Sequence, residues 1–309
     1  MKKSLLFSLF MLFAFAGANA QLLYKVSGKG LDKPSYIIGT YHLAPATFVD
    51  SIPGARTALE SVEQVCGEVV MSEMFQPENL QKVQAAMLLP DGQELETIFS
   101  PAEMERINAY MKSIIGADLS NPMIKGSMGK MSPAALASQL QMVQYVKLTP
   151  GFNPNEMIDS YFQTEGARMG KSIAGLETID FQIGVLYTGT PLERQKEKLL
   201  CVVDNSEFTL MVMKKVASAY FSQDMAAIKE AFDEKMGNSC DSTPEEDNAL
   251  IYDRNVNWVV SMPAIMSEKS TLFVVGAGHL PGERGVIELL RKEGYTVEAV
   301  NSPAQAVVE

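Results

Sequence analysis

The chain has 309 residues, of which 47% are hydrophobic and 20% charged, and its formal net charge is −11. These values are typical of a globular protein and exclude the collagen-like and disordered classes. Because the chain is acidic and has no basic stripe, we expect no nucleic-acid partner.

The first twenty residues, 1–20, have the pattern of a secretory signal peptide. A short basic stretch precedes an apolar run, and Ala18-Asn19-Ala20 is a small-x-small cleavage signal. The apolar run is short for a bilayer span, and no later segment is apolar for long enough, so we expect no transmembrane helix after cleavage. The sequence therefore predicts an exported protein, periplasmic or secreted, whose mature part is a single domain over 21–309.

The N-terminal elements are expected to be strands around one short helix. Residues 22–26 and 35–40 are apolar and β-prone, and the Gly- and Pro-containing segment between them predicts a hairpin. A short helix is expected over 52–61, with Pro53 near its start. The apolar run 64–71 predicts a buried strand.

The middle of the chain has helical patterns with recognisable starts. A hydroxyl residue, a proline and then a glutamate form a capping box with proline at the first helical position. The full pattern occurs at Ser100, Thr190 and Thr243, and Ser132 has its first half. Further helical patterns cover 155–170, 190–236 and 244–262.

Strand patterns return towards the C-terminus. Residues 172–176, 271–275 and 295–300 read as strands, and a helix over 285–294 ends at a glycine. We therefore expect the α/β fold class, with a central mixed sheet built from N- and C-terminal strands and a helical subdomain inserted at about 77–265. This layout brings both ends of the sequence to one site.

Three cysteines allow one disulfide at most. Export makes a disulfide chemically possible, and Cys201–Cys240 is the candidate pair because both residues lie in the helix-rich second half. Cys66 lies in an apolar run, where a buried free thiol is expected.

The only two histidines of the chain, His42 and His279, stand in matching contexts. Each is the fourth residue of a G-x-x-H motif that follows an apolar strand, beginning at Gly39 and Gly276. Glycine there permits a tight turn or a close backbone approach, and ligands of open α/β sheets bind at the carboxyl ends of strands. Histidine is a common metal ligand and general base. We predict one shared site; two structural histidines are the alternative.

A carboxylate is expected to complete a metal site. Glu68 interrupts the apolar run 64–71, where an unpaired charge would be costly, unless that strand has a solvated edge. Two histidines and one carboxylate can hold a divalent metal and lower the pKa of its bound water. We therefore expect His42, His279 and Glu68 as metal ligands.

Further chemistry is expected from a second carboxylate and an arginine. Glu177 ends the short strand over 172–176, and Arg254 and Asn255 lie on a helical pattern near the C-terminal strands. An arginine there can hold a substrate carboxylate or a developing oxyanion. A plain ion pair between Arg254 and a glutamate is the alternative.

Taken together, these pieces resemble the TraB/GumN family, which includes the Tiki proteins. The matching pieces, in order, are Ser35 through Leu43, Glu68, Gly170 through Thr178, Arg254-Asn255 with Trp258, and Val274 through His279. The resemblance implies a fold related to erythromycin esterase and the haem-binding ChaN proteins. It also implies metal-dependent proteolysis supported by manganese or cobalt. Carried over by motif, His42, His279 and Glu68 are metal ligands or catalytic groups, and Glu177, Arg254 and Asn255 complete the site.

The predicted function is that of an exported metal-dependent hydrolase, with a peptidase as the favoured form. A metal-bound water would attack an amide or ester carbonyl of a peptide or small molecule, and Glu177 or Glu68 would take the proton. Mn²⁺ or Co²⁺ is the expected cofactor, with Zn²⁺ as a further candidate. The alternatives are a metal-free esterase with a histidine base, a haem- or ligand-binding protein that uses Tyr41 or His42, and an interaction protein that keeps only the fold.

Overall fold

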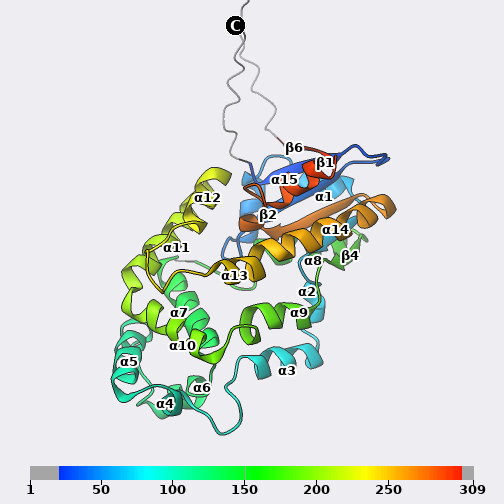
Figure 1. Cartoon of the computed structure of the whole chain (residues 1–309). Helices are drawn as coiled ribbons and strands as arrows, with labels where there is room; N and C mark the ends of the chain where they lie inside the picture. The colour runs from blue at the N-terminus through cyan, green and yellow to red at the C-terminus, as the bar shows by residue number, and fades with distance from the viewer. Residues whose placement is uncertain (1–20, 150, 301–309) are drawn as a thin grey trace, which may run out of the picture.

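A six-stranded mixed sheet lies at the centre of the described structure, in the order β4-β3-β5-β2-β1-β6 (Figure 1). The computed structural model describes residues 21–149 and 151–300, so the expected signal peptide, 1–20, lies outside the described residues. The strands are β1 (Leu23–Ser27), β2 (Ser35–Thr40), β3 (Gln64–Gly67), β4 (Ser172–Gly175), β5 (Thr271–Gly276) and β6 (Thr296–Ala299). The predicted α/β class, with a sheet built from terminal strands around a helical region, is confirmed.

The strand register aligns the carboxyl ends of four parallel strands, β4, β3, β5 and β2. Thr40 of β2 lies opposite Gly276 of β5, and Gly67 of β3 lies opposite both Val274 and Gly175. The remaining two strands are antiparallel, β1 to β2 and β6 to β1. The chain therefore leaves all four parallel strands at the same edge of the sheet, where ligands of such sheets bind.

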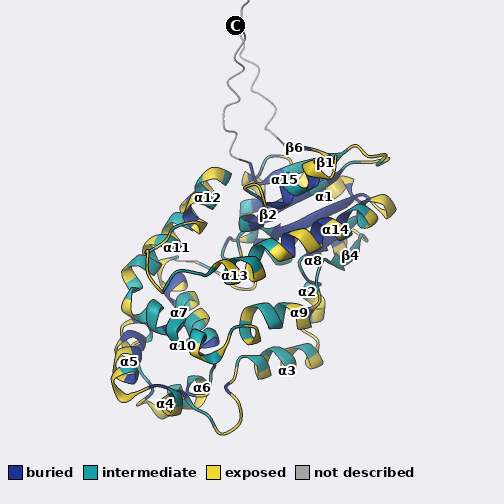
Figure 2. Cartoon of the chain, viewed as in Figure 1, coloured by how far each residue is buried: buried dark blue, intermediate teal, exposed yellow. Residues whose placement is uncertain are grey.

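Helices cover both faces of the sheet, and alternate strand side chains pack against them. The helices are α1 (Ala55–Ser61) and α8 (Ile158–Arg168) on one face and α14 (Asp253–Glu268) and α15 (Val286–Lys292) on the other. Ile38 packs in one core with Phe162 of α8, whereas Ile37 packs in the other with Met262 of α14 and Leu290 of α15. Figure 2 shows the buried residues concentrated in the sheet between these layers.

The segment between β3 and β5 is mostly helical and carries its own apolar core. Besides α8 and α14, its helices are α2 (Met71–Met74), α3 (Pro77–Ala86), α4 (Leu95–Ile98), α5 (Pro101–Ile115), α6 (Pro122–Met128), α7 (Pro133–Leu148), α9 (Ile179–Ile183), α10 (Leu192–Asp204), α11 (Ser206–Phe221), α12 (Met225–Phe232) and α13 (Pro244–Asp247). Two π-helical turns, η2 (Gly184–Thr188) and η3 (Asn248–Tyr252), and two 3-10 turns, η1 (Ala46–Ser51) and η4 (Ala277–His279), complete the helical elements of the described chain. Ile107, Met111, Leu136, Leu140 and Leu199 form the centre of the separate core.

Three of the four predicted helix starts are confirmed. The hydroxyls of Ser100, Ser132 and Thr243 each accept a hydrogen bond from a backbone N–H in the first turn of their helix. The helix predicted after Thr190 is present as α10, but it begins at Leu192 with Pro191 as its N-cap, so the expected cap by the Thr190 hydroxyl is absent. The carbonyl of Thr190 accepts a hydrogen bond of 2.8 Å from the Gln195 side chain.

The candidate disulfide is present between Cys201 of α10 and Cys240, and Cys66 is a buried free thiol, as expected. Burial raises the pKa of the Cys66 thiol to about 12. The disulfide closes a segment of 39 residues and ties α10 to the loop that precedes α13.

Within residues 21–149 and 151–300, no helix has the length and apolar character needed to cross a membrane.

Candidate functional site

Four side chains predicted from the sequence emerge just beyond the carboxyl ends of the four parallel strands. Glu68 directly follows β3, Glu177 follows β4 by two residues, His42 follows β2 by two residues and His279 follows β5 by three. Because these strands are neighbours in register, their ends deliver residues from distant parts of the sequence to one place.

A cavity of about 350 Å³ lies at this edge of the sheet. His42, His279, Glu68 and Arg254 line it, whereas Glu177 and Asn255 are outside the lining. The structure thus brings both histidines to one cavity and places four of the six predicted site residues on its wall.

Arg254 is the centre of a buried ionic network beside the cavity. Its side chain is 5% exposed, and its guanidinium donates two hydrogen bonds to Glu177, of 2.7 and 2.9 Å, and one of 2.6 Å to Glu68. A further donor reaches the carbonyl of Leu250 at 3.0 Å. The network contains two carboxylates for one guanidinium, so removing the arginine would leave two buried negative charges unpaired.

The R-N-x-x-W motif orients this network because Arg254 and Trp258 lie one turn apart on α14. The indole Nε1 of Trp258 donates to Glu177 at 2.8 Å, and the guanidinium lies 4.9 Å from the centroid of the indole ring. Glu177 is therefore held on both oxygens by two residues of one helix face. We assign it the position of an anchor for Arg254.

Glu68 is bound on both oxygens but remains at the cavity wall. Its Oε1 accepts from the backbone N–H of Gly276 at 2.8 Å, and its Oε2 accepts from Gln182 at 3.1 Å and from Arg254. Burial alone would raise the pKa of Glu68, but the net shift is downward because His279, Arg254 and His42 carry positive charge in the acid range where a carboxyl titrates. Glu68 is therefore ionised at neutral pH.

His279 is held as a neutral imidazole. The side-chain amide of Asn255 donates to the carbonyls of His279 and Arg284, at 3.2 and 2.9 Å, so its Oδ1 accepts from Nδ1–H of His279 at 2.7 Å. The Nε2 lone pair then faces Arg254 at 3.1 Å. Burial lowers the pKa of His279 to about 4.

His42 has the opposite electrostatic environment. Its side chain is 70% exposed, and its Nδ1 lies 3.2 Å from a carboxylate oxygen of Asp159 on α8. The Asp159 charge raises the pKa of His42 to about 9. The hydroxyl of Thr40 donates to the other oxygen of Asp159 at 2.5 Å, which fixes the carboxylate in place. An orienting carboxylate behind one ring nitrogen leaves Nε2 of His42 for the cavity.

Close packing explains the glycines that end the strands. Neither Gly39 nor Gly276 has a positive φ, so the expected tight turn is not their role. A Cβ on Gly39 would lie 2.8 Å from Leu280 and 3.1 Å from Ala277, so the two G-x-x-H segments pack directly against each other. A Cβ on Gly67 would lie 2.1 Å from Nε2 of Gln163.

Gln163 of α8 holds the turn that presents Glu68. This buried side chain donates to the carbonyl of Val69 at 2.8 Å and accepts from the N–H of Met71 at 2.9 Å. The hydrogen bonds end β3 at Gly67, so the strand expected over 64–71 is shorter than predicted.

Sequence reasoning missed Asp159, Gln163 and Gln182. Asp159 is an acidic residue in the first turn of a helix, a position that is common for reasons of helix electrostatics alone. Glutamines on amphipathic helices give no signal either. Only the packing of α8 and α9 beside the strand ends identifies these three residues as parts of the site.

The arrangement of donors does not fit the expected three-ligand metal site. Glu68 and the Nε2 of His279 are both turned towards the guanidinium of Arg254. Among the described residues, no group of three His, Cys, Asp or Glu side chains is placed to hold a metal ion. A cation bound by His42, His279 and Glu68 would require Arg254 to leave its present position, since it carries a positive charge between two of the three.

Comparisons with known proteins agree in family. The sequence model of the TraB/PrgY/gumN family matches residues 22–299. The chain is 22% identical over 305 residues to the metalloprotease TIKI2 of Danio rerio, with 86% of this chain and 58% of that protein covered. It is likewise 22% identical over 307 residues to the metalloprotease TIKI1 of Homo sapiens, with 86% and 60% covered. The chain thus spans about three-fifths of the length of these relatives. No solved structure matches it.

Proposed function

This chain belongs to the TraB/PrgY/gumN family, and we propose that it is a hydrolase of amide or ester bonds, with a peptidase as the favoured form. The observation that carries the proposal is the pairing of His42 with Asp159 on the wall of a cavity that also contains Arg254 and Glu68. The metalloprotease relatives support peptides as the substrate class.

His42 is the proposed general base. In its neutral form, Nε2 takes a proton from water as the water oxygen attacks the carbonyl carbon, and Asp159 stabilises the imidazolium that forms. The imidazolium then returns the proton to the leaving amine or alcohol. This assigns to His42 the proton transfer that sequence reasoning gave to Glu68 or Glu177, because both carboxylates already bind Arg254.

Arg254 is the proposed electrostatic partner of the developing oxyanion. Its guanidinium lines the cavity and is fixed by Glu68, Glu177 and the Leu250 carbonyl before any substrate enters. A positive charge that is already held in place stabilises a developing negative charge without reorganisation. Asn255 is a positioning residue in this proposal, because its hydrogen bond to Nδ1 sets the tautomer of His279.

A divalent cation is the proposed cofactor only because the relatives are named metalloproteases, and Mn²⁺, Co²⁺ and Zn²⁺ are the ions to test. Since Glu68 and His279 are turned to Arg254, the proposed proton transfers use only this chain's own residues.

We also propose export through residues 1–20, to a periplasm or beyond the cell. A helical subdomain at about 77–265 is proposed as well, and the separate core of the insert supports it.

The test is cleavage of a mixed peptide library by the mature protein, read by mass spectrometry. Parallel reactions contain a chelator, Mn²⁺, Co²⁺ or Zn²⁺. We expect His42→Ala to lose at least about a hundredfold in kcat/KM, the range of general acid–base catalysis. Activity of His42→Ala equal to that of the unchanged protein would contradict the proposal.

A metal-free esterase is the second candidate, favoured by the contact between Arg254 and His279. Hydrolysis of small esters that is insensitive to chelator, with no cleavage of peptides, would select it over the peptidase.

A further inference from the structure

The cavity has two chemically different sides. The strand ends supply its polar side, with His42, Glu68 and His279. The helical insert supplies most of its large apolar lining residues. This apolar wall consists of Val185, Leu186, Val216, Phe232, Leu250 and Ile251.

Two π-helical turns build much of the apolar wall. Val185 and Leu186 belong to η2, and Leu250 and Ile251 belong to η3, which contacts η2. A π turn is rare and is found preferentially at functional sites, since it alters the direction of side chains along a helix. The η3 turn also leads directly into Arg254, whose guanidinium binds the Leu250 carbonyl.

Phe232 completes the apolar wall next to the second G-x-x-H motif. Its ring lies against Gly278, because a Cβ placed there would come within 2.8 Å of two ring carbons. Phe232 nevertheless remains 51% exposed, as Leu186 and Leu250 remain 49% and 44% exposed. Large apolar side chains left open together mark a binding surface.

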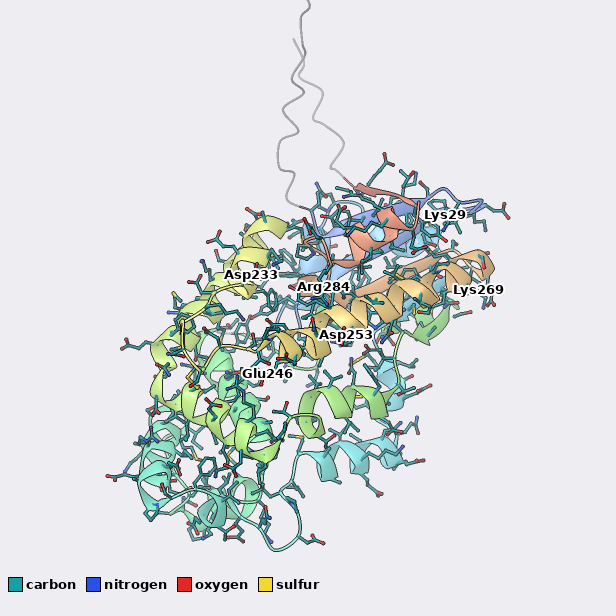
Figure 3. The ribbon with its side chains drawn as sticks, in the orientation of Figure 1. Lys29, Asp233, Glu246, Asp253, Lys269 and Arg284 are labelled. Carbon is teal, nitrogen blue, oxygen red and sulfur yellow. A yellow bond between two sulfur atoms is a disulfide. The ribbon has the colours of Figure 1, made fainter. Side chains whose placement is uncertain are left out.

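None of the residues that form the apolar wall is charged. Asp233 and Asp253 directly follow Phe232 and η3, yet neither is among the residues that line the cavity. Figure 3 labels both, together with Arg284 in the loop before α15. A charged substrate group placed against this wall would lose its hydration without gaining a partner.

We propose that the apolar wall selects substrates with a bulky, uncharged, aliphatic or aromatic group beside the carbonyl that is cleaved. The inference rests on the proposed function and specifies the substrate of the same cavity. The apolar group occupies the side formed by Phe232, Leu186 and Leu250, while His42 faces the reacting carbonyl. The expected substrates are peptides or esters with Leu-, Met- or Phe-like groups at the cleaved bond, whereas Glu, Lys and Gly at that place are disfavoured.

The first experiment measures cleavage preference. The mature protein, Phe232→Ser and Leu186→Ser are given the same peptide library, and the residues flanking each cut are read by mass spectrometry. We expect the unchanged protein to prefer a large apolar residue over Gly by at least about tenfold, as burial of such a side chain implies. Both variants should lose most of that preference. Phe75→Ser is the matched control, because Phe75 is 67% exposed and outside the cavity lining.

The second experiment measures binding without turnover. Trp258 is the only tryptophan of the chain, and its ring centroid lies 4.4 Å from that of His279, so its fluorescence reports on the site. His42→Ala protein is titrated with N-acetyl amides of Leu, Phe, Gly and Glu. We expect saturable binding of the Leu and Phe compounds at least about tenfold tighter than that of the Gly and Glu compounds.

The outcomes separate this inference from the proposed function. Cleavage without apolar preference, or a preference in Phe232→Ser and Leu186→Ser as strong as in the unchanged protein, overturns the inference and leaves the hydrolase standing. Apolar-selective binding without cleavage of any peptide or ester supports the apolar wall and overturns the hydrolase. Equal binding of all four amides overturns the inference whatever the activity.

Discussion

The two histidines show that the same short motif can place an imidazole in opposite states. Asp159 raises the pKa of His42 to about 9, whereas burial lowers that of His279 to about 4. At neutral pH the first is mostly a cation and the second a neutral acceptor. Their shared G-x-x-H context gives the position of each residue, and the groups that α8 and α14 bring to them give the protonation state.

The acid limb of activity should follow His42. If His42 is the general base, kcat/KM rises as its imidazole loses its proton, up to about pH 9. A neighbouring negative charge favours the protonated form, so Asp159→Asn should move that limb to lower pH, towards the ordinary histidine pKa of about 6.5. The measurement is kcat/KM against pH. Asp50→Asn, which changes an exposed aspartate paired with Arg56, serves as the control and should leave the limb in place.

Stability should fall on both sides of neutrality. His279 has a folded pKa of about 4, below the unfolded value of about 6.5. Between those values only the unfolded state binds the proton, so stability falls as pH drops from about 6.5 to 4, by roughly 3 kcal/mol in all. The His42 pKa is raised, so its pairing stabilises below about pH 6.5 and is lost towards pH 9.

Urea denaturation at a series of pH values tests these two limbs. His279→Gln should flatten the acid limb and His42→Gln the alkaline one. An acid limb that persists unchanged in His279→Gln would contradict the assignment of a buried neutral imidazole.

Arg254 should be more important for stability than any exposed arginine. Arg254→Met leaves Glu68 and Glu177 without their cation, and breaking a buried ion pair from one side costs about 3–5 kcal/mol. The matched variant Arg56→Met breaks an exposed pair with Asp50 and should cost much less, because solvent screens that pair. Equal denaturation midpoints for the two variants would show that the network is not tightly coupled to folding.

At the level of elements, the site depends on how closely helices approach the strand ends. Gly67→Ala should destabilise by about 1–3 kcal/mol, since the added methyl group would lie 2.1 Å from the Gln163 amide that holds the Glu68 turn. Gly126→Ala on α6 is the control with the opposite expected sign. Its added Cβ would have no neighbour within 4 Å, so the substitution should stabilise the protein by about 0.5–1 kcal/mol. Thermal unfolding of both variants checks the signs, and a neutral Gly67→Ala would mean that Gln163 moves away at little cost.

The sequence predicted elements where local chemistry decides, and failed where distant contacts decide. Ser100 and Thr243 cap their helices because the partner N–H lies three residues away. Thr190 is a local exception, since the helix after it begins at Leu192 and the Thr190 hydroxyl does not cap it. Glu68 could be found as a charge in an apolar run, but Asp159 could not, since its partner His42 lies more than a hundred residues earlier in the chain.

At the scale of the whole molecule, the disulfide links the helical insert to the segment that leads to Arg254. Cys201–Cys240 joins α10 to the loop before α13, and Arg194 of α10 reinforces the link through Glu246. Closing 39 residues implies a loss of about 4 kcal/mol in a Cys201→Ser/Cys240→Ser protein. Guanidinium denaturation of the double variant and of the unchanged protein checks this value. A double variant as stable as the unchanged protein would show that the ionic contacts suffice.

The parallel pairing of β2 with β5 also sets the order in which the molecule can be completed. Thr40 of β2 pairs with Gly276 of β5, and the long chain segment between them folds largely into helices around a separate core. Local helices form quickly, whereas pairing over such a separation is slow. A folding chain would therefore hold a folded insert and an unfinished sheet until β5 pairs with β2. The cavity forms in the last stage of folding, and a product that stops short of His279 would have no site.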